Sequence, residues 1–239
     1  MNFIFESVFK IMMTEFYNIN VNHPNNFNLT QVPDMDVDTI WALQTQAQAK
    51  HKGLVAQVFD RVSLGFLEDR GFNLIYTTHF AKLNIRDYVG EPVVTVDELE
   101  PDLKQELLML LRDHYERIHR TNPASKNINY QEWLFGNRHF DLKHSIVRLS
   151  QQHIVAVILI FENENDFKLG WTFGDDVSVL LDLWRDLLGI LPIGKVLYAE
   201  FESNDLFAMS VYDTFMWHDI DTVAQTLLWQ DTSKNLRNV

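Results

Sequence analysis

The fold is decided by the stretch from Val196 to Trp217, which reads VLYAEFESNDLFAMSVYDTFMW. It predicts a strand, an Asn-bearing turn and a helix that ends on aromatic residues. Strand alternation places Glu200 and Glu202 on the same face of this strand. The turn residue is Asn204, and Tyr212 lies in the helix.

The segments around this stretch complete a mixed sheet. Before it, HSIVRLS, HIVAVILIFE and FKLGWTFG predict three strands, and the polar turns QQ and NEND make them an antiparallel meander. A long helix from Pro101 and a short helix at NYQEWLFG precede the meander, and the helix VSVLLDLWRDLLG follows it. TVAQTLLWQ is the last predicted strand. The order predicts an α/β fold, with an antiparallel meander and a late strand–helix–strand crossover, flanked by helices.

The first third of the chain predicts a similar run of elements. Apolar residues from Phe5 to Phe16 repeat at helical spacing, and a polar loop rich in Asn and Pro follows. TIWALQTQAQ predicts a strand, GLVAQVFDRVSLGFLEDRGF a helix stopped at Gly71, and FNLIYTTHFAKLNI a strand. Helix, strand, helix and strand therefore occur in the same order as in residues 177–230, which suggests an internal duplication.

Composition narrows the classes of function. The 239 residues carry a formal net charge of −13, which disfavours nucleic acid and membrane surfaces as partners. Cysteine is absent, so the chain has no disulfide or thiolate metal site, as is usual in the cytoplasm. Neither His114 with His119 nor His139 with His144 has the spacing of a zinc helix, so no metal is expected. We expect a cytoplasmic protein without a membrane-spanning segment.

Three stretches resemble the GCN5-related N-acetyltransferase (GNAT) family: LGWTFGD, the opening stretch, and FLEDRGFNLIY. The first is similar to that family's fourth strand. The opening stretch is similar to the fifth strand and the helix after it, and FLEDRGFNLIY is similar to the end of that helix and the sixth strand. The resemblance implies a partial unit in residues 1–88, with only the C-terminal half of the fold, and a GNAT-like unit in residues 89–239. It also places the cofactor loop of the partial unit before Met1.

The resemblance implies a function as well. Members transfer an acetyl group from acetyl-coenzyme A to an amine, carried by a small molecule or a peptide. It implies Tyr212 as the general acid and assigns the cofactor to one strand and one turn, with these contact residues: Trp171, Thr172, Phe173, Gly174 and Asn204. The alternative is a non-catalytic GNAT-like domain that binds a protein partner or a small ligand, and either could form a homodimer.

One segment departs from the family pattern. A GNAT carries a Gly-rich loop whose amides hold the cofactor pyrophosphate, whereas this chain reads FGDDVSVLLDLW, with Gly174 as its only glycine. Asp175 and Asp176 would repel phosphate and suit the cap and first turn of the next helix. The phosphate loop is therefore predicted to be degenerate. Glu162, Glu200 and Glu202 remain open as possible general bases.

Overall fold

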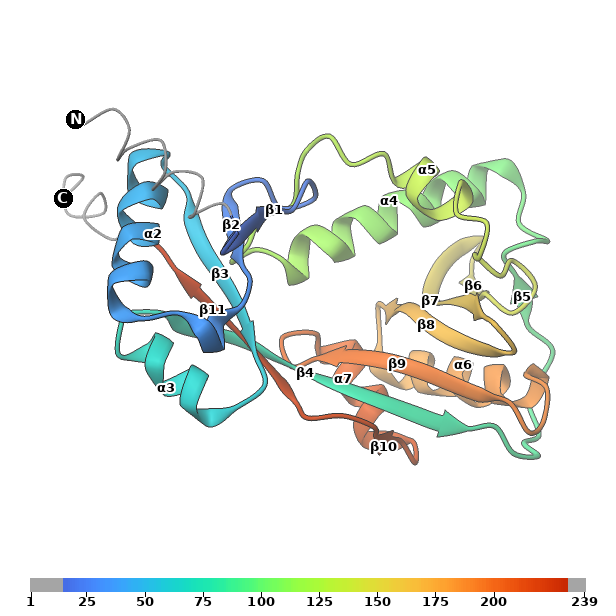
Figure 1. The fold of residues 1–239 in the computed structure, drawn as a ribbon. Coiled ribbons are helices and arrows are strands. Elements are labelled where there is room, and N and C mark those ends of the chain that lie inside the picture. The colour runs from blue at the N-terminus through green and yellow to red at the C-terminus, as the bar shows by residue number, and fades with distance from the viewer. Residues whose placement is uncertain (1–14, 232–239) are drawn as a thin grey trace. The chain divides into compact units, whose positions relative to one another are not determined.

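The fold is described from a computed structural model, in which residues 15–231 are described (Figure 1). The helix predicted from Phe5 lies almost entirely outside these residues, and so does the polar tail after residue 231. The described chain forms two compact units. The first comprises residues 15–77, 119–127 and 223–231, and the second comprises residues 78–118 and 128–222. The division into a partial GNAT-like unit, residues 1–88, and a GNAT-like unit, residues 89–239, stays a prediction.

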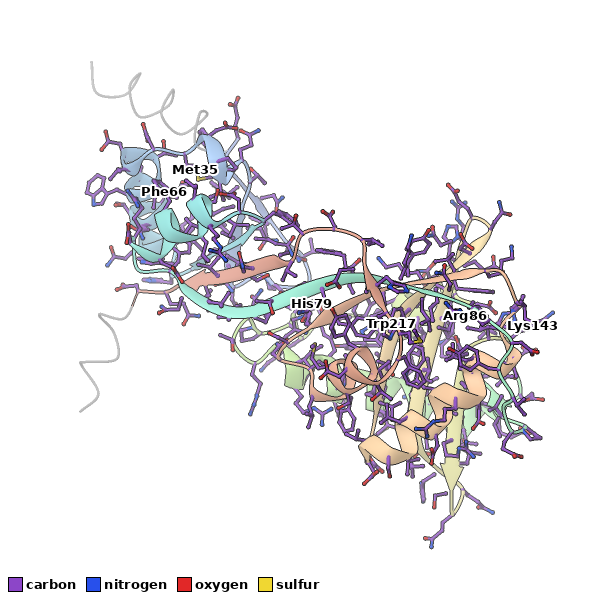
Figure 2. The ribbon with its side chains drawn as sticks, turned by 90° about the horizontal axis from the view of Figure 1, so that it is seen from below. Met35, Phe66, His79, Arg86, Lys143 and Trp217 are labelled. Carbon is purple, nitrogen blue, oxygen red and sulfur yellow. The ribbon has the colours of Figure 1, made fainter. Side chains whose placement is uncertain are left out.

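The first unit is a small mixed sheet with two helices. Its strands are β1 (Tyr17–Ile19), β2 (Asn26–Leu29), β3 (Gly53–Val58) and β11 (Ala224–Trp229). β2 and β3 are parallel, while β1 with β2 and β3 with β11 are antiparallel. The helical elements are η1 (Val32–Asp34), α2 (Val37–Ala49) and α3 (Arg61–Glu68). Their apolar sides cover one core, in which Met35 is buried and Phe66 is half-buried (Figure 2).

The strand predicted at TIWALQTQAQ is wrong, because this segment forms α2. The Asp36 carboxylate caps the helix by accepting a hydrogen bond from the Thr39 amide at 2.8 Å. Ile40, Leu43 and Ala47 are buried at helical spacing. The short alternation of apolar and polar residues misled the prediction, and the Ala and Gln content favours a helix.

The single helix predicted from Gly53 is also wrong, because the segment is divided into β3 and α3. Most of β3 is buried, and it lies between β2 and β11, so its apolar run shows no alternation. The Asp60 carboxylate begins α3 by accepting hydrogen bonds from the amides of Val62 and Ser63. The predicted stop is confirmed, since Gly71 follows α3 with a φ of 80°.

The polar loop predicted before α2 in fact contains β1, β2 and η1. As a result, β2, α2 and β3 form a parallel strand–helix–strand crossover. The strand-to-helix loop of the first unit is therefore present, at residues 30–36. The prediction that this loop would precede Met1 is wrong. It ends on the Asp36 cap.

The second unit confirms the predicted mixed sheet with a meander and a late crossover. Its strand order is β5–β6–β7–β8–β9–β4, with β10 paired to β4, and only β8 and β9 are parallel. The strands are β4 (Asn73–Asn84), β5 (Val94–Thr95), β6 (Ile146–Ser150), β7 (His153–Asn163), β8 (Asp166–Gly174), β9 (Val196–Glu202) and β10 (His218–Asp219).

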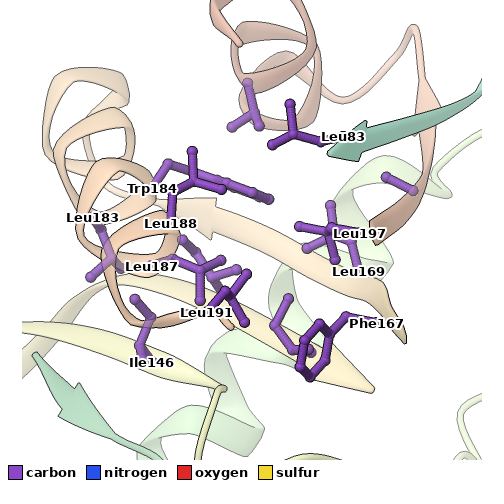
Figure 3. Close-up of a cluster of buried hydrophobic side chains, with 14 of the residues drawn as sticks. Leu83, Ile146, Phe167, Leu169, Leu183, Trp184, Leu187, Leu188, Leu191 and Leu197 are labelled. Atoms are coloured by element: carbon purple, nitrogen blue, oxygen red, sulfur yellow. The ribbon is translucent and has the colours of Figure 1, made fainter. Parts of the chain in front are cut away.

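Helices cover this sheet with two separate cores. The four helices are α4 (Pro101–Ile118), α5 (Tyr130–Phe135), α6 (Val177–Ile190) and α7 (Leu206–Thr214). One core includes apolar residues of α4 and α5. In the other, the α6 residues Leu183, Trp184 and Leu187 pack on side chains of the sheet, as Figure 3 shows. Each core contains on the order of ten or more buried side chains. These contacts hold the helices on the sheet, and so position a site rigidly.

Each unit contains a strand from the other end of the sequence. β11, close to the C-terminus, pairs with β3 of the first unit through Leu227↔Ala56. β4, from the first third of the chain, pairs with β9 of the second unit through His79↔Phe201. Sequence periodicity carries no information on such long-range partners.

Candidate functional site

A bulge in β8 opens the parallel pair β8–β9. The two strands pair only through Phe167↔Leu197 and Lys168↔Tyr198. On the other edge of β8, Leu159 pairs with Trp171 and the next residue of β7 pairs with Leu169, so Gly170 is the additional residue. A bulge bends its strand, and β8 leaves β9 directly after Lys168. A Cβ at Gly170 would clash with the Phe161 ring.

The bulge also determines which way the predicted cofactor strand presents its side chains. Trp171 and Phe173 pack in the α4/α5 core, and the Phe173 ring stacks on His114 with 4.5 Å between centroids. Thr172 is buried on the other face, where its hydroxyl accepts a hydrogen bond from Trp184 Nε1 at 2.7 Å. A Cβ at Gly174 would lie 2.8 Å from the Val155 carbonyl oxygen. The side chains of Thr172 and Phe173 are thus used for packing, and Trp171 is half-buried.

A polar network of Asp205, His114 and Arg117 lies beside Phe173, near the end of β8. Asp205 caps α7 by accepting hydrogen bonds from the amides of Phe207 and Ala208 at 3.0 and 3.3 Å. Its other oxygen lies 3.0 Å from His114 Nε2, and Arg117 lies 2.9 Å from His114 Nδ1. Because Arg117 can only donate, His114 accepts at Nδ1 and donates from Nε2 to Asp205. The network joins α4 to the start of α7, and Phe207 packs against both cores.

The N-terminus of α6 is already occupied by a carboxylate. Asp176 accepts hydrogen bonds from the amides of Ser178 and Val179 at 2.7 and 3.3 Å, which confirms its predicted role as a cap. The hydrogen bond from the Ser178 hydroxyl, followed by those from the two amides, lowers the pKa of Asp176. The Asp175 amide donates to the Val155 carbonyl at 2.9 Å. These amides are not free for a phosphate, so a diphosphate group does not fit here.

The two other predicted site residues have partners elsewhere. The Tyr212 hydroxyl donates to Asp219 of β10 at 2.9 Å, and its ring lies 4.7 Å from that of His79 of β4. Burial, and then the hydrogen bond to Asp219, raise the pKa of Tyr212 above its ordinary value. Asn204 Nδ2 donates to the Ile118 carbonyl at 2.8 Å. These contacts of Tyr212 run to β4 and β10, on the side of β9 away from β8.

Glu202 is a titratable group of β9 that lies four residues beyond the last pair with β8. Leu197, Ala199 and Phe201 enter the α6/α7 core, so Glu202 lies on the opposite face of β9. Its Oε2 atom is buried without a hydrogen-bond partner among the described residues. Burial, with smaller contributions from the Asp205 and Glu200 carboxylates, raises the pKa of Glu202 to about 7. The sequence offered Glu202 as one of three possible general bases. Its burial depends on the packing around β9, which the sequence pattern does not show.

Two cavities flank β8. One of about 190 Å³ lies along α4 and the end of β8, and includes His114, Arg117 and Asp175. A larger one of about 540 Å³ lies near α5 and the bulge, and includes Trp133, Trp171 and Glu200. Among residues 15–231, no three His, Asp or Glu side chains gather as metal ligands. None of the helices in the described part of the chain combines the length and apolar character needed to cross a membrane.

The mixed sheet of the second unit, flanked by helices and with β8 and β9 as its parallel pair, has the fold of solved GCN5-related N-acetyltransferases. The crystal structure of a GCN5-related N-acetyltransferase from Sphaerobacter thermophilus is similar to this chain, with a TM-score of 0.64 and 10% identity over 90% of this chain and 76% of that one. A functionally unknown conserved protein from Staphylococcus epidermidis ATCC 12228 has a TM-score of 0.55 and 8% identity, over 88% of this chain and 86% of that one. No family model matches the sequence, and no curated protein matches it.

Proposed function

We propose that this chain is an acetyltransferase-like protein that transfers an acetyl group from acetyl-coenzyme A to an amine. The observation that carries the proposal is the separation of β8 from β9 after Lys168, with Glu202 on β9 four residues beyond the last β8–β9 pair and with its pKa raised to about 7. A general base is most effective when its pKa lies near the operating pH. The solved acetyltransferase of the same fold supports the reaction class.

The protein groups needed for the reaction follow from its proton balance. When the amine nitrogen bonds to the acetyl carbonyl carbon, the nitrogen must lose a proton and the departing sulfur must gain one. Glu202 would accept the first proton, directly or through one water molecule, because it is deprotonated above a pH of about 7. Tyr212 remains the residue that the family resemblance offers for the second, and it would have to leave Asp219 to reach the opening.

Binding of the cofactor is expected to be weak. Acetyl-coenzyme A supplies the acetyl group as a thioester, and the backbone of residues 171–174, which follow the last β8–β9 pair, would hold its chain. Its diphosphate has no place at the α6 N-terminus, where Asp176 occupies the amides. Each carboxylate near 4 Å from a phosphate charge costs ~1 kcal/mol in water and more where water is scarce.

Calorimetric titration with acetyl-coenzyme A tests the proposal. We expect binding in the range from high micromolar to millimolar, and absence of binding at millimolar concentration would refute the acetyltransferase assignment. If Tyr212 is the acid, Tyr212→Phe lowers turnover and leaves the binding affinity unchanged. Unchanged turnover would remove Tyr212 from the mechanism.

A second candidate function is a non-catalytic domain that binds a partner or a small ligand. It is favoured by one observation, the Asp176 cap that replaces the phosphate cradle. The titration separates the two candidates, because a non-catalytic domain of this kind has no need to bind acetyl-coenzyme A.

We further propose a tandem origin for the chain. The run β2–α2–β3–α3–β4 has the same order as β8–α6–β9–α7–β10, and in both the first two strands are parallel. Both crossover helices also begin on an Asp cap, Asp36 and Asp176. A cytoplasmic location, a small-molecule or peptide acceptor, and a homodimer belong to the same proposal. The absence of cysteine supports the location, and the net charge of −13 argues against nucleic acid and membranes as partners.

A further inference from the structure

The separation of β8 from β9 contains a side chain of α7. The two strands pair for the last time at Lys168↔Tyr198, and α7 packs against both of them. Phe207, in the first turn of α7, is half-buried and contacts apolar side chains of both cores of the second unit. We propose that the Phe207 ring closes the separation, and that it must move before the thioester arm of acetyl-coenzyme A can lie along β8. This inference rests on the proposed function, for which it names the residue that controls access of the cofactor.

The position of Phe207 follows from the two faces of the sheet. Ile158 and Leu159 are successive residues of β7, and they point into the α6/α7 core and the α4/α5 core, respectively. Because successive residues of a strand face opposite sides, the two cores lie on opposite faces of the sheet. Beyond the last β8–β9 pair, β8 continues beside β7 and β9 continues beside β4. A side chain of α7 that reaches both cores therefore lies where β8 and β9 have separated.

Polar contacts hold the ring from two sides. The Asp205 carboxylate accepts a hydrogen bond from the Phe207 amide at 3.0 Å, which fixes the first turn of α7. The Arg117 guanidinium of α4 lies 5.5 Å from the centroid of the Phe207 ring, within the range of a cation–π contact. His114 links these two groups, because it donates to Asp205 and accepts from Arg117. Its ring also stacks on Phe173, so α4, β8 and the start of α7 form one connected group with Phe207.

A closed separation lowers the apparent affinity for the cofactor. The thioester arm can bind only to the fraction of molecules in which the ring has moved, so the measured affinity falls in proportion to that fraction. Moving the ring exposes apolar surface and breaks its contacts with both cores, so the open form is the minor one. This effect is separate from the repulsion of phosphate by Asp175 and Asp176, because it acts on the uncharged arm of the cofactor.

Calorimetric titration of the full chain with S-acetylpantetheine tests the inference, because this probe carries the thioester arm without the phosphates. We expect Phe207→Ala to bind the probe at least ~10-fold more tightly than the wild type. Arg117→Met removes the guanidinium at an exposed position and keeps an apolar stem, so it should bind the probe about 2- to 5-fold more tightly. This second variant gives the answer if Phe207→Ala does not fold.

The matched control is Phe66→Ala in the first unit. Phe66 is also half-buried, packs against the core of that unit, and has the Arg70 guanidinium 3.7 Å from its ring centroid. Its truncation should leave the affinity for S-acetylpantetheine unchanged. An unchanged affinity in both Phe207→Ala and Arg117→Met, or an equal gain in Phe66→Ala, would overturn the inference.

Titration of the same variants with acetyl-coenzyme A separates this inference from the proposed function. Binding to Phe207→Ala but not to the wild type would support the closing role of Phe207 and refute acetyl transfer by the wild-type chain. Equal binding to the wild type and to Phe207→Ala would overturn only the inference. Binding to neither would refute both.

Discussion

At the scale of single residues, the behaviour of the candidate site depends on Glu202. Its Oε2 atom is buried without a hydrogen-bond partner among residues 15–231, and the two carboxylates that act on it, Asp205 and Glu200, contact His114 and Lys168. Burial makes the ionised form of this carboxylate unfavourable in free energy, so Glu202 stays protonated up to about neutral pH. Natural proteins accept such a cost chiefly at functional sites.

The linkage between this proton and folding has a definite sign. The pKa of Glu202 is about 7 in the folded chain, against an ordinary value of 4.5. Between these values the folded state holds a proton that the unfolded state has lost, so this group makes stability fall as pH rises through the window. The total loss is about 3 kcal/mol, complete above a pH of about 7.

Glu202→Gln removes the titrating group and keeps the shape of the side chain. We expect the variant to be more stable than the wild type at pH 8, and to lose most of that advantage at pH 5. Urea unfolding of both proteins at the two pH values measures the difference, which should change by about 2–3 kcal/mol. A stability difference that is the same at pH 5 and pH 8 would show that Glu202 titrates normally.

At the scale of elements, helix caps explain both what the sequence predicted and what it missed. Asp176 was predicted as a cap and is one, because an Asp before an apolar helical repeat is a strong local signal. Asp36 and Asp60 are caps of the same kind, but the short alternation after Asp36 and the continuous apolar run before Asp60 hid α2 and β3. The bulge at Gly170 has no local signature, since it depends on the register with β7.

Replacing the α6 cap separates its structural role from its effect on the cofactor. Asp176→Ser keeps a side-chain acceptor at the N-cap and removes the negative charge, so we expect a stability change below about 1 kcal/mol. Acetyl-coenzyme A should bind about 5-fold more tightly, because one repulsive charge is gone. Asp36→Ser, at the matching cap of the first unit, should leave the affinity unchanged. Identical affinities for both variants and the wild type would separate the α6 N-terminus from the cofactor site.

At the scale of the whole molecule, the two units are completed by strands from opposite ends of the chain. β11 belongs with β3, and β4 extends from the first unit into the second, where it pairs with β9. Local periodicity predicted the existence of β4 and β11, and the meander and late crossover, because these follow from neighbouring segments. It could not predict the exchange of partners, which depends on contacts between residues more than a hundred positions apart.

Cavities in the two cores test this assignment of strands. Leu227 of β11 is fully buried in the core of the first unit, and Leu183 of α6 is fully buried in that of the second. Each Leu→Ala substitution should cost about 2–5 kcal/mol. By native-state hydrogen exchange, Leu227→Ala should accelerate exchange in β3 and α2, and Leu183→Ala in β6, β7 and β8. Unchanged protection of β3 in Leu227→Ala would contradict the pairing of β11 with β3.

The most direct test of the central claim is acetyl transfer itself, measured by mass spectrometry of a set of small amines and peptides incubated with acetyl-coenzyme A and the full chain. We predict an acetylated amine above the rate in buffer, a rate that rises with pH to a plateau above about 7, and loss of at least ~100-fold in Glu202→Gln. Glu68→Gln should retain the wild-type rate. Product formation at the buffer rate, or an active Glu202→Gln variant with an unchanged pH profile, would contradict the assignment of the β8–β9 opening as an acetyl-transfer site.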